Sequence, residues 1–171
     1  IEEMAISMAT VVGNPSSTHS FGRQAKSVLE NARKVIAKNI NASSNEIIFT
    51  SGATEAINWI LNNAVNKLGV TRFITSKIEH HAVLDTLKKI QTEKNITIDY
   101  VALNEFGAVS YTNLVSLLDF NTPTLVCLMH VNNEIGSLLD LQKVGTICKQ
   151  HNAYFMSDTV QSIGKFVLDV Q

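Results

Sequence analysis

The sequence has little of several residue types, and each shortage narrows the class of protein. Only two cysteines and two prolines occur in 171 residues. Two cysteines cannot form a disulfide framework, so a reducing, cytoplasmic compartment is expected. No apolar run approaches the ~18 residues of a membrane-spanning helix. With 14 Lys plus Arg against 15 Asp plus Glu, bulk charge gives no support for binding to nucleic acid or a membrane surface.

What is present indicates an ordinary globular domain. The chain is 45% hydrophobic and nearly neutral, which argues against disorder. No internal repeat, low-complexity tract or Pro/Gly/Ser-rich linker divides it, so a single domain over residues 1–171 is expected. The sequence begins Ile1-Glu2-Glu3 rather than with methionine, and we expect it to begin inside a longer protein.

Helical and strand patterns alternate along the chain. Apolar positions recur at helical spacing from Phe21 to Ile40, and this spacing predicts an amphipathic helix. Thr124–Met129 is the most apolar run and predicts a strand buried on both faces. Further helices are expected over 56–68, 80–91, 111–118 and 141–151, and further strands over 47–50, 72–76, 96–101 and 153–157. This alternation predicts an α/β fold, with a largely parallel sheet flanked by helices.

Ligands of such sheets bind beyond the carboxyl ends of the strands, so residues that follow strands are informative. Ser51–Glu55 lies between a predicted strand and a predicted helix. Its small residues, the free N–H groups of the helix start and the Thr54 hydroxyl suit a phosphate. The alternative is an ordinary turn in which Thr54 caps the helix.

A histidine pair follows the next predicted strand. A flat imidazole at His80 can stack on an aromatic ring and move protons near neutral pH. The alternative is a capping residue beside a solvated histidine. His81 and Asp85 are four residues apart, but two ligands do not make a zinc site, so no metal is expected.

Two later segments complete the set of candidates. In the segment from His130 to Gly136, Asn132 and Asn133 offer amide donors and acceptors, although asparagines also favour turns for conformational reasons. In the segment Ser157–Gln161, the carboxylate of Asp158 can hold a positively charged heteroaromatic nitrogen, or it can cap a helix. A phosphate cradle, an imidazole, an amide and a carboxylate together match the needs of a pyridoxal phosphate pocket.

The sequence resembles the cysteine desulfurases of the class V aminotransferase family, which are pyridoxal phosphate (PLP) enzymes of fold type I. The iron–sulfur-assembly branch is the more similar one. The motifs that carry the resemblance run through nearly the whole chain: Gly13–His19 with Phe21–Arg23, Phe49–Glu55, Glu79-His80, Met129–Gly136 and Asp158–Lys165.

The resemblance implies roles for particular residues. His80 would stack on the pyridine ring and serve in proton transfer, and Asp158 would pair with the protonated ring nitrogen. Ala53 and Thr54 would bind the phosphate of the cofactor, and Gln161 would hydrogen-bond its phenolic oxygen. Asn133 would reach the region of the phenolic oxygen and the substrate carboxylate. In the family this pocket takes sulfur from L-cysteine to an enzyme persulfide and releases alanine, for iron–sulfur cluster assembly.

Family residues that perform the chemistry are not matched in this sequence. It stops at Gln171 before the Schiff-base lysine, and neither Cys127 nor Cys148 matches the persulfide cysteine. We therefore expect part of a PLP-binding large domain, without the small C-terminal domain and inactive by itself. The alternatives are a non-catalytic module that pairs with a full-length desulfurase, a decayed gene product, or another class V PLP enzyme. Family members are homodimers, so a homodimer is also expected.

Overall fold

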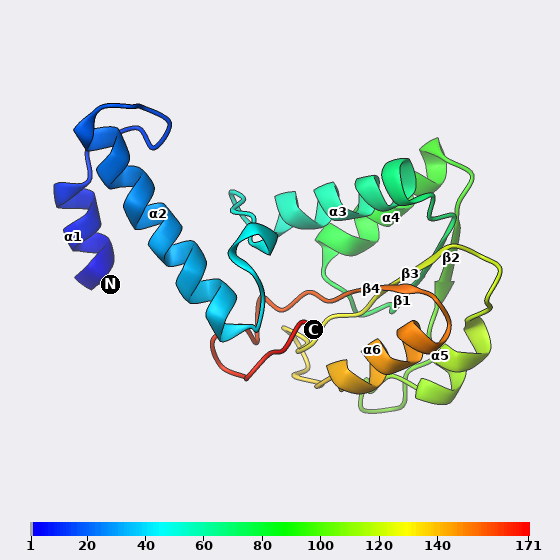
Figure 1. The fold of residues 1–171 in the computed structure, drawn as a ribbon. Coiled ribbons are helices and arrows are strands. Elements are labelled where there is room, and N and C mark those ends of the chain that lie inside the picture. Colours follow the sequence, from blue (N-terminus) through cyan, green and yellow to red (C-terminus); the bar gives the residue numbers. More distant parts are fainter. Residues whose placement is uncertain (1) are drawn as a thin grey trace. The chain divides into compact units, whose positions relative to one another are not determined.

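The structure, a computed structural model, describes residues 2–171 and divides into two compact units (Figure 1). Unit 1 combines the residues up to Phe49 with the segment Gly164–Gln171, and unit 2 is Thr50–Ile163. Within residues 2–171, no helix is both long and apolar enough to cross a membrane.

Unit 1 is built around the long helix predicted from the apolar spacing. Helix α2 spans Ser20–Asn39, which confirms that prediction, and the imidazole of His19 caps it by accepting from the Gly22 N–H at 3.3 Å. Helix α1 (Glu2–Thr10) has no predicted counterpart, because none of its residues is buried and its apolar positions mark no face. A short 3-10 helix, η1 (Ser44–Glu46), follows α2.

The prediction of a strand over residues 47–50 is wrong. The segment is apolar and β-branched, as a strand should be, but it pairs with no strand among the described residues. Instead the carbonyl of Ile47 accepts a hydrogen bond from the guanidinium of Arg33 in α2, and the same guanidinium lies 4.7 Å from the centre of the Phe49 ring. The backbone N–H and C=O groups of a strand need hydrogen-bond partners on a neighbouring strand, and here the Ile47 carbonyl is paired with a side chain instead.

Unit 2 contains a four-stranded parallel sheet in the order β2-β1-β3-β4. Its strands are β1 (Arg72–Thr75), β2 (Thr97–Tyr100), β3 (Thr124–Cys127) and β4 (Tyr154–Met156). Its helices are α3 (Ala53–Leu68), α4 (His81–Glu93), α5 (Tyr111–Leu117) and α6 (Leu141–Gln150). The predicted α/β class, with helices flanking a parallel sheet, is confirmed.

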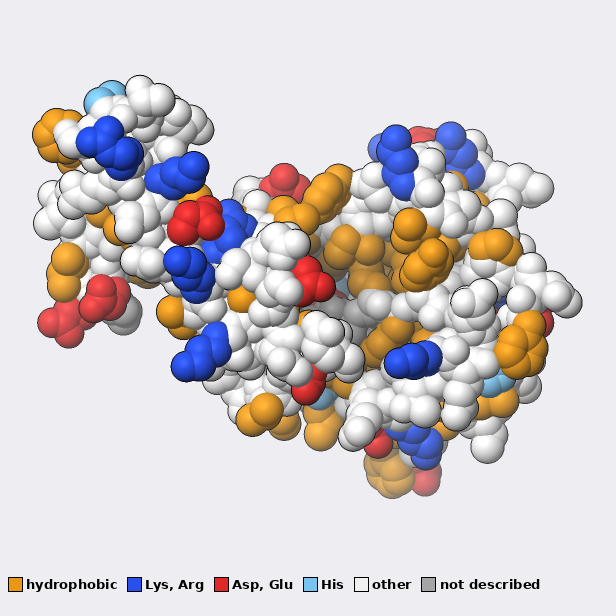
Figure 2. Space-filling view, viewed as in Figure 1, with side chains coloured by type: hydrophobic (Ala, Val, Ile, Leu, Met, Phe, Trp, Pro, Cys, Tyr) orange, Lys and Arg blue, Asp and Glu red, His pale blue; other side chains and the backbone are white. Residues whose placement is uncertain are grey.

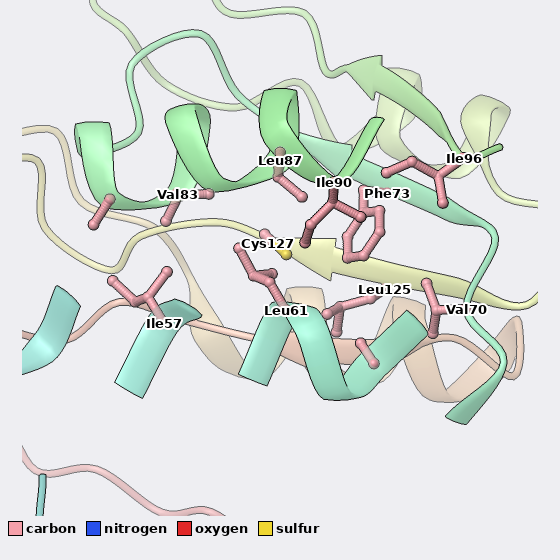
Figure 3. Close-up of a cluster of buried hydrophobic side chains, with 12 residues drawn as sticks. Ile57, Leu61, Val70, Phe73, Val83, Leu87, Ile90, Ile96, Leu125 and Cys127 are labelled. Atoms are coloured by element: carbon pink, nitrogen blue, oxygen red, sulfur yellow. The ribbon is translucent and has the colours of Figure 1, made fainter. Parts of the chain in front are cut away.

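Each face of the sheet has its own hydrophobic core. Helices α3 and α4 cover one face and helices α5 and α6 the other (Figure 1). Phe73 and Leu61 belong to the first core, which Figure 3 shows, while the neighbouring Ile74 packs with Leu114 in the second. Successive strand residues point to opposite faces, so one short strand supplies both cores. All four residues of β3 are buried, as its apolar run predicts.

Charged side chains are distributed over the surface. On the face in Figure 2, Lys and Arg side chains occur on both units with Asp and Glu among them. On this face, basic and acidic side chains are therefore intermixed and do not form one large basic patch and one large acidic patch.

Candidate functional site

One cavity of unit 2 brings together the six residues to which the resemblance assigns contacts with the cofactor. Its volume is about 290 Å³, and it lies where the strands of the parallel sheet end. The six predicted residues in its lining are Ala53 and Thr54 of α3, His80 before α4, Asn133 after β3, and Asp158 and Gln161 after β4. The other residues that line it are Gly52, Ala82, Met129 and Val160.

The start of α3 presents backbone N–H groups at this cavity. Gly52 is the residue before the helix, and within residues 2–171 no side chain caps this end. Thr54 is the second residue of α3, so the alternative in which it caps the helix is wrong. The unpaired N–H groups and the positive end of the helix dipole favour an anion, and the Thr54 side chain lies beside them.

His80 caps a helix, as one of the two alternatives had it, and it also lines the cavity. It caps α4, where its Nδ1 accepts a hydrogen bond from the Ala82 N–H at 3.1 Å. Because Nδ1 is the acceptor, a neutral ring carries its proton on Nε2. The ring lines the cavity at the same time. His80 and His81 are nearly perpendicular, at 70°, and no group of three or more potential metal ligands occurs within residues 2–171.

Asp158 is half-buried in the loop after β4. One oxygen of its carboxylate accepts a hydrogen bond from the Val160 N–H at 2.9 Å, which closes a local turn. No helix follows within the described residues, so the alternative that Asp158 caps a helix is wrong. The backbone carbonyl of Asp158 accepts from the His130 N–H at 2.9 Å and continues the pairing of β3 with β4. This pairing fixes where the carboxylate lies relative to the loop after β3.

Glu79 is a buried acid beside the cavity. The sequence motifs assigned it no role in the site. Its side chain is 7% exposed, and Oε1 accepts from the Ser76 hydroxyl at 2.7 Å. Burial, with a smaller contribution from the negative charge of Asp158, raises the pKa of Glu79 to about 7, although the hydrogen bonds from Ser76 and the Met129 backbone lower it. The available signal was its place directly before His80, since a residue between a buried strand and a site is itself often buried.

The two cysteines and His130 lie outside the lining of this cavity. Cys127 in β3 and Cys148 in α6 are free and almost fully buried. Burial raises the pKa of Cys148 to about 12 and raises that of Cys127 well above its usual value. His130, three residues after the end of β3, is buried, and its burial lowers its pKa. Thiols so protected are poor nucleophiles.

Fold and cavity together define a class of protein. The model of the family "Aminotransferase class-V" matches residues 1–171, and the chain belongs to this family.

Within the family, the chain is homologous to cysteine desulfurases, as its motifs suggested. It is 39% identical over 173 residues to "Cysteine desulfurase IscS" of Clostridium botulinum (strain Kyoto / Type A2), covering all of this chain and 43% of that protein. It is 40% identical to "Putative cysteine desulfurase IscS 1" of Bacillus subtilis (strain 168), covering all of this chain and 45% of that protein. The chain therefore spans less than half the length of these relatives.

Solved structures agree with the sequence relatives. A NifS-like protein matches with a TM-score of 0.91 and 37% identity over 99% of this chain and 47% of its own. A structure described as "SspA in complex with cysteine" matches with a TM-score of 0.90 and 30% identity, covering 99% of this chain and 49% of its own. The resemblance to cysteine desulfurases that the motifs indicated is thereby confirmed.

Proposed function

We propose that residues 1–171 form the cofactor-binding part of the large domain of a PLP-dependent cysteine desulfurase. Its substrate is L-cysteine, and its sulfur is destined for iron–sulfur cluster assembly. The observation that carries the proposal is the convergence of six predicted residues, from four separate segments, on one cavity. Class V aminotransferases and cysteine desulfurases are PLP enzymes, and relatives of the latter kind match the whole chain. The two free thiols agree with the cytoplasmic location that we also propose.

The residues of the cavity fit this cofactor in size and in chemistry. A volume of about 290 Å³ is close to the lower end of the range, about 300 Å³ and above, for small-molecule sites. The uncapped start of α3 suits a phosphate, and the imidazole of His80 offers a flat face to a pyridine ring. The carboxylate of Asp158 suits a protonated ring nitrogen. No lining residue is a lysine or an arginine, so the helix start is the anion site of this cavity.

Each side chain then has a definite task. PLP, when bound, supplies an electron sink for the substrate carbon. Asp158 keeps the ring nitrogen protonated, because a nearby carboxylate favours the charged form of a cationic partner. Gln161 and Asn133 supply amide groups that orient oxygen atoms of the cofactor and the substrate. His80 holds a proton at Nε2, and its Nδ1 bond to the Ala82 N–H fixes the plane of the ring.

Binding of PLP tests the proposal directly. We expect the protein to bind PLP with a defined stoichiometry, and Asp158→Asn to weaken binding about ten- to a hundredfold, the loss typical of a charge-assisted contact worth about 1.5–3 kcal/mol. Titration followed by PLP absorbance and fluorescence measures both affinities. Asp85→Asn is the matched control, since Asp85 is exposed on α4 and does not line the cavity. Equal PLP affinity of wild type and Asp158→Asn would contradict the proposed role.

The 171-residue chain by itself is expected to release no sulfide from L-cysteine. By resemblance, it contains neither the lysine that attaches the cofactor nor the cysteine that accepts sulfur. Sulfide and alanine are measured against a blank that contains PLP without protein. Borohydride reduction of the PLP-loaded chain should fix no stoichiometric adduct at one lysine. Sulfide above the blank, or such an adduct, would overturn this part of the proposal.

A pairing role is the second candidate function. In it, the chain is a non-catalytic module that associates with a full-length desulfurase or with a second copy. Large apolar side chains exposed on the helices favour it, among them Trp59 and Ile60 on α3, which are 50% and 42% exposed. Exposed aromatic and aliphatic groups of this kind are common at protein interfaces.

A further inference from the structure

Asn132, in the loop after β3, uses its whole side-chain amide inside the protein. The residue is 5% exposed and directly precedes Asn133, which lines the cavity. Its Nδ2 donates to the Ile78 carbonyl at 2.7 Å and lies 3.2 Å from the sulfur of Met129. Its Oδ1 accepts from the N–H groups of Glu134 and Ile135, both at 2.9 Å. Two donated and two accepted contacts exhaust the capacity of a carboxamide.

These contacts join separate parts of the candidate site. Ile78 lies two residues before His80, and Met129 is itself part of the lining. The bonds from the N–H groups of Glu134 and Ile135 close the turn that begins at Asn133. Asn132 and Ile78 are 54 positions apart in sequence, so their hydrogen bond ties two loops, alongside the hydrogen bond that Glu79 accepts from the Met129 backbone.

The backbone of Asn132 anchors the same turn. Its N–H donates to the Ser137 carbonyl at 3.0 Å, and its carbonyl accepts from the Gly136 N–H at 3.1 Å. Because the turn is held at both ends, the side-chain bond to Ile78 transmits the position of one loop to the other. Only an amide serves both sides: a carboxylate can accept from the turn, but it cannot donate to the Ile78 carbonyl.

We propose that Asn132 is a positioning residue, whose buried amide sets the loop that carries His80 against the loop that carries Asn133. It does not line the cavity and acts through its neighbours. The inference rests on the proposed function only for its consequence for PLP, because the coupling between the loops is a property of the unliganded protein.

Two variants distinguish the donor function of the Asn132 amide from its acceptor function. Asn132→Ala removes all four contacts. Asn132→Asp keeps the acceptors for Glu134 and Ile135 but loses the donor to the Ile78 carbonyl. Asn62→Ala is the matched control, because the Asn62 amide makes a single bond to the Asn58 carbonyl, at 2.8 Å, on the exposed surface of α3.

Amide hydrogen exchange in the unliganded protein is the first measurement. We expect residues 76–82 to exchange about 5- to 100-fold faster in both Asn132 variants, and residues 131–137 in Asn132→Ala, the effect of losing a buried hydrogen bond worth about 1–3 kcal/mol. Exchange in β3 and α6 should be unchanged, and Asn62→Ala should behave as wild type. Faster exchange in 131–137 alone would overturn the proposal, since Asn132 would then only close its own turn. If the alanine variant fails to fold, the aspartate variant decides, because it retains the turn.

Binding of PLP is the second measurement, with the same variants. Weaker binding by Asn132→Asp, with unchanged binding by Asn62→Ala, supports the positioning role. Equal PLP affinity despite faster exchange in both loops would overturn that role and leave a structural link alone. If the wild-type protein binds no PLP, the proposed function fails, whereas the exchange result still decides whether Asn132 couples the two loops.

Discussion

Replacing Phe73 by alanine is expected to lower the free energy of unfolding of unit 2 by about 3–5 kcal/mol, the range for a fully buried phenylalanine. Phe73 is 0% exposed, and its strand β1 lies between β2 and β3 in the sheet. Its ring packs among side chains of α4 and β3, Ile90 and Leu125 among them (Figure 3). Removing it leaves a cavity that rigid strands on both sides cannot fill.

Urea unfolding followed by the fluorescence of Trp59 measures this loss, since Trp59 lies in α3 of the same unit. Phe106→Ala is the matched control. The Phe106 side chain is 76% exposed, so its loss should change stability by no more than about 0.5 kcal/mol. Equal losses in the two variants would show that Phe73 does not pack in the core of the folded protein.

Replacing Glu79 by glutamine is expected to stabilise the protein at pH 8 by about 2–3 kcal/mol and to leave it almost unchanged at pH 4. Burial raises the pKa of Glu79 from 4.5 to about 7. Each unit of pKa shift corresponds to about 1.4 kcal/mol, which sets an upper limit of about 3.5 kcal/mol. Glutamine keeps the shape and can accept from the Ser76 hydroxyl as Glu79 does, but it never carries the buried charge.

The sign follows from which state holds the proton. Between pH 4.5 and about 7, the unfolded chain ionises at Glu79 while the folded protein keeps the proton. The folded state then binds more protons, so its stability falls as the pH rises through this window. Below pH 4.5 both states are protonated, and the contribution of Glu79 disappears. The difference in stability between Glu79→Gln and wild type should therefore grow from pH 4.5 and level off above pH 7.

Urea unfolding at a series of pH values gives this difference curve, in which the contributions of all other groups cancel. Glu105→Gln is the control, because Glu105 is exposed on a surface loop and the variant should follow the wild type at every pH. A flat curve for Glu79→Gln would mean that Glu79 has an ordinary pKa in the folded protein. The result also bears on the site, since the charge of Asp158 contributes to the raised pKa.

Local pattern predicted most elements of unit 2, because helices and strands there are amphipathic or fully apolar. The strands at Phe73 and at Val126 were found from short apolar runs, and α6 from its helical spacing. The same reasoning failed for Ile47–Thr50, whose apolar character is that of a strand but which meets Arg33 rather than another strand. Pairing depends on a partner that is distant in sequence, and no local pattern reports whether it is there.

Motifs after predicted strands identified the candidate site. Parallel strands end at one edge of a sheet, so His80, Asn133 and Asp158 were expected to converge, and they line one cavity. The residues that support them were not found. The sequence left Asn132 open between an amide of the site and a turn residue, and it offered Glu79 only as part of a motif, because burial and long-range hydrogen bonds give no signal in a single sequence.

The sequence by itself determined the fold class, the family and six of the residues that line the cavity, since these depend on periodicity and on short motifs in order. Only the tertiary structure decided which buried residues support the lining of the cavity, and that the pKa of one of them, Glu79, is raised. The amide of Asn132 donates to the carbonyl of Ile78, which is 54 positions away in sequence. The carboxyl of Glu79 is shielded from water only in the folded protein. Both effects arise from packing between distant segments, where desolvation and hydrogen-bond geometry are set by the folded chain as a whole.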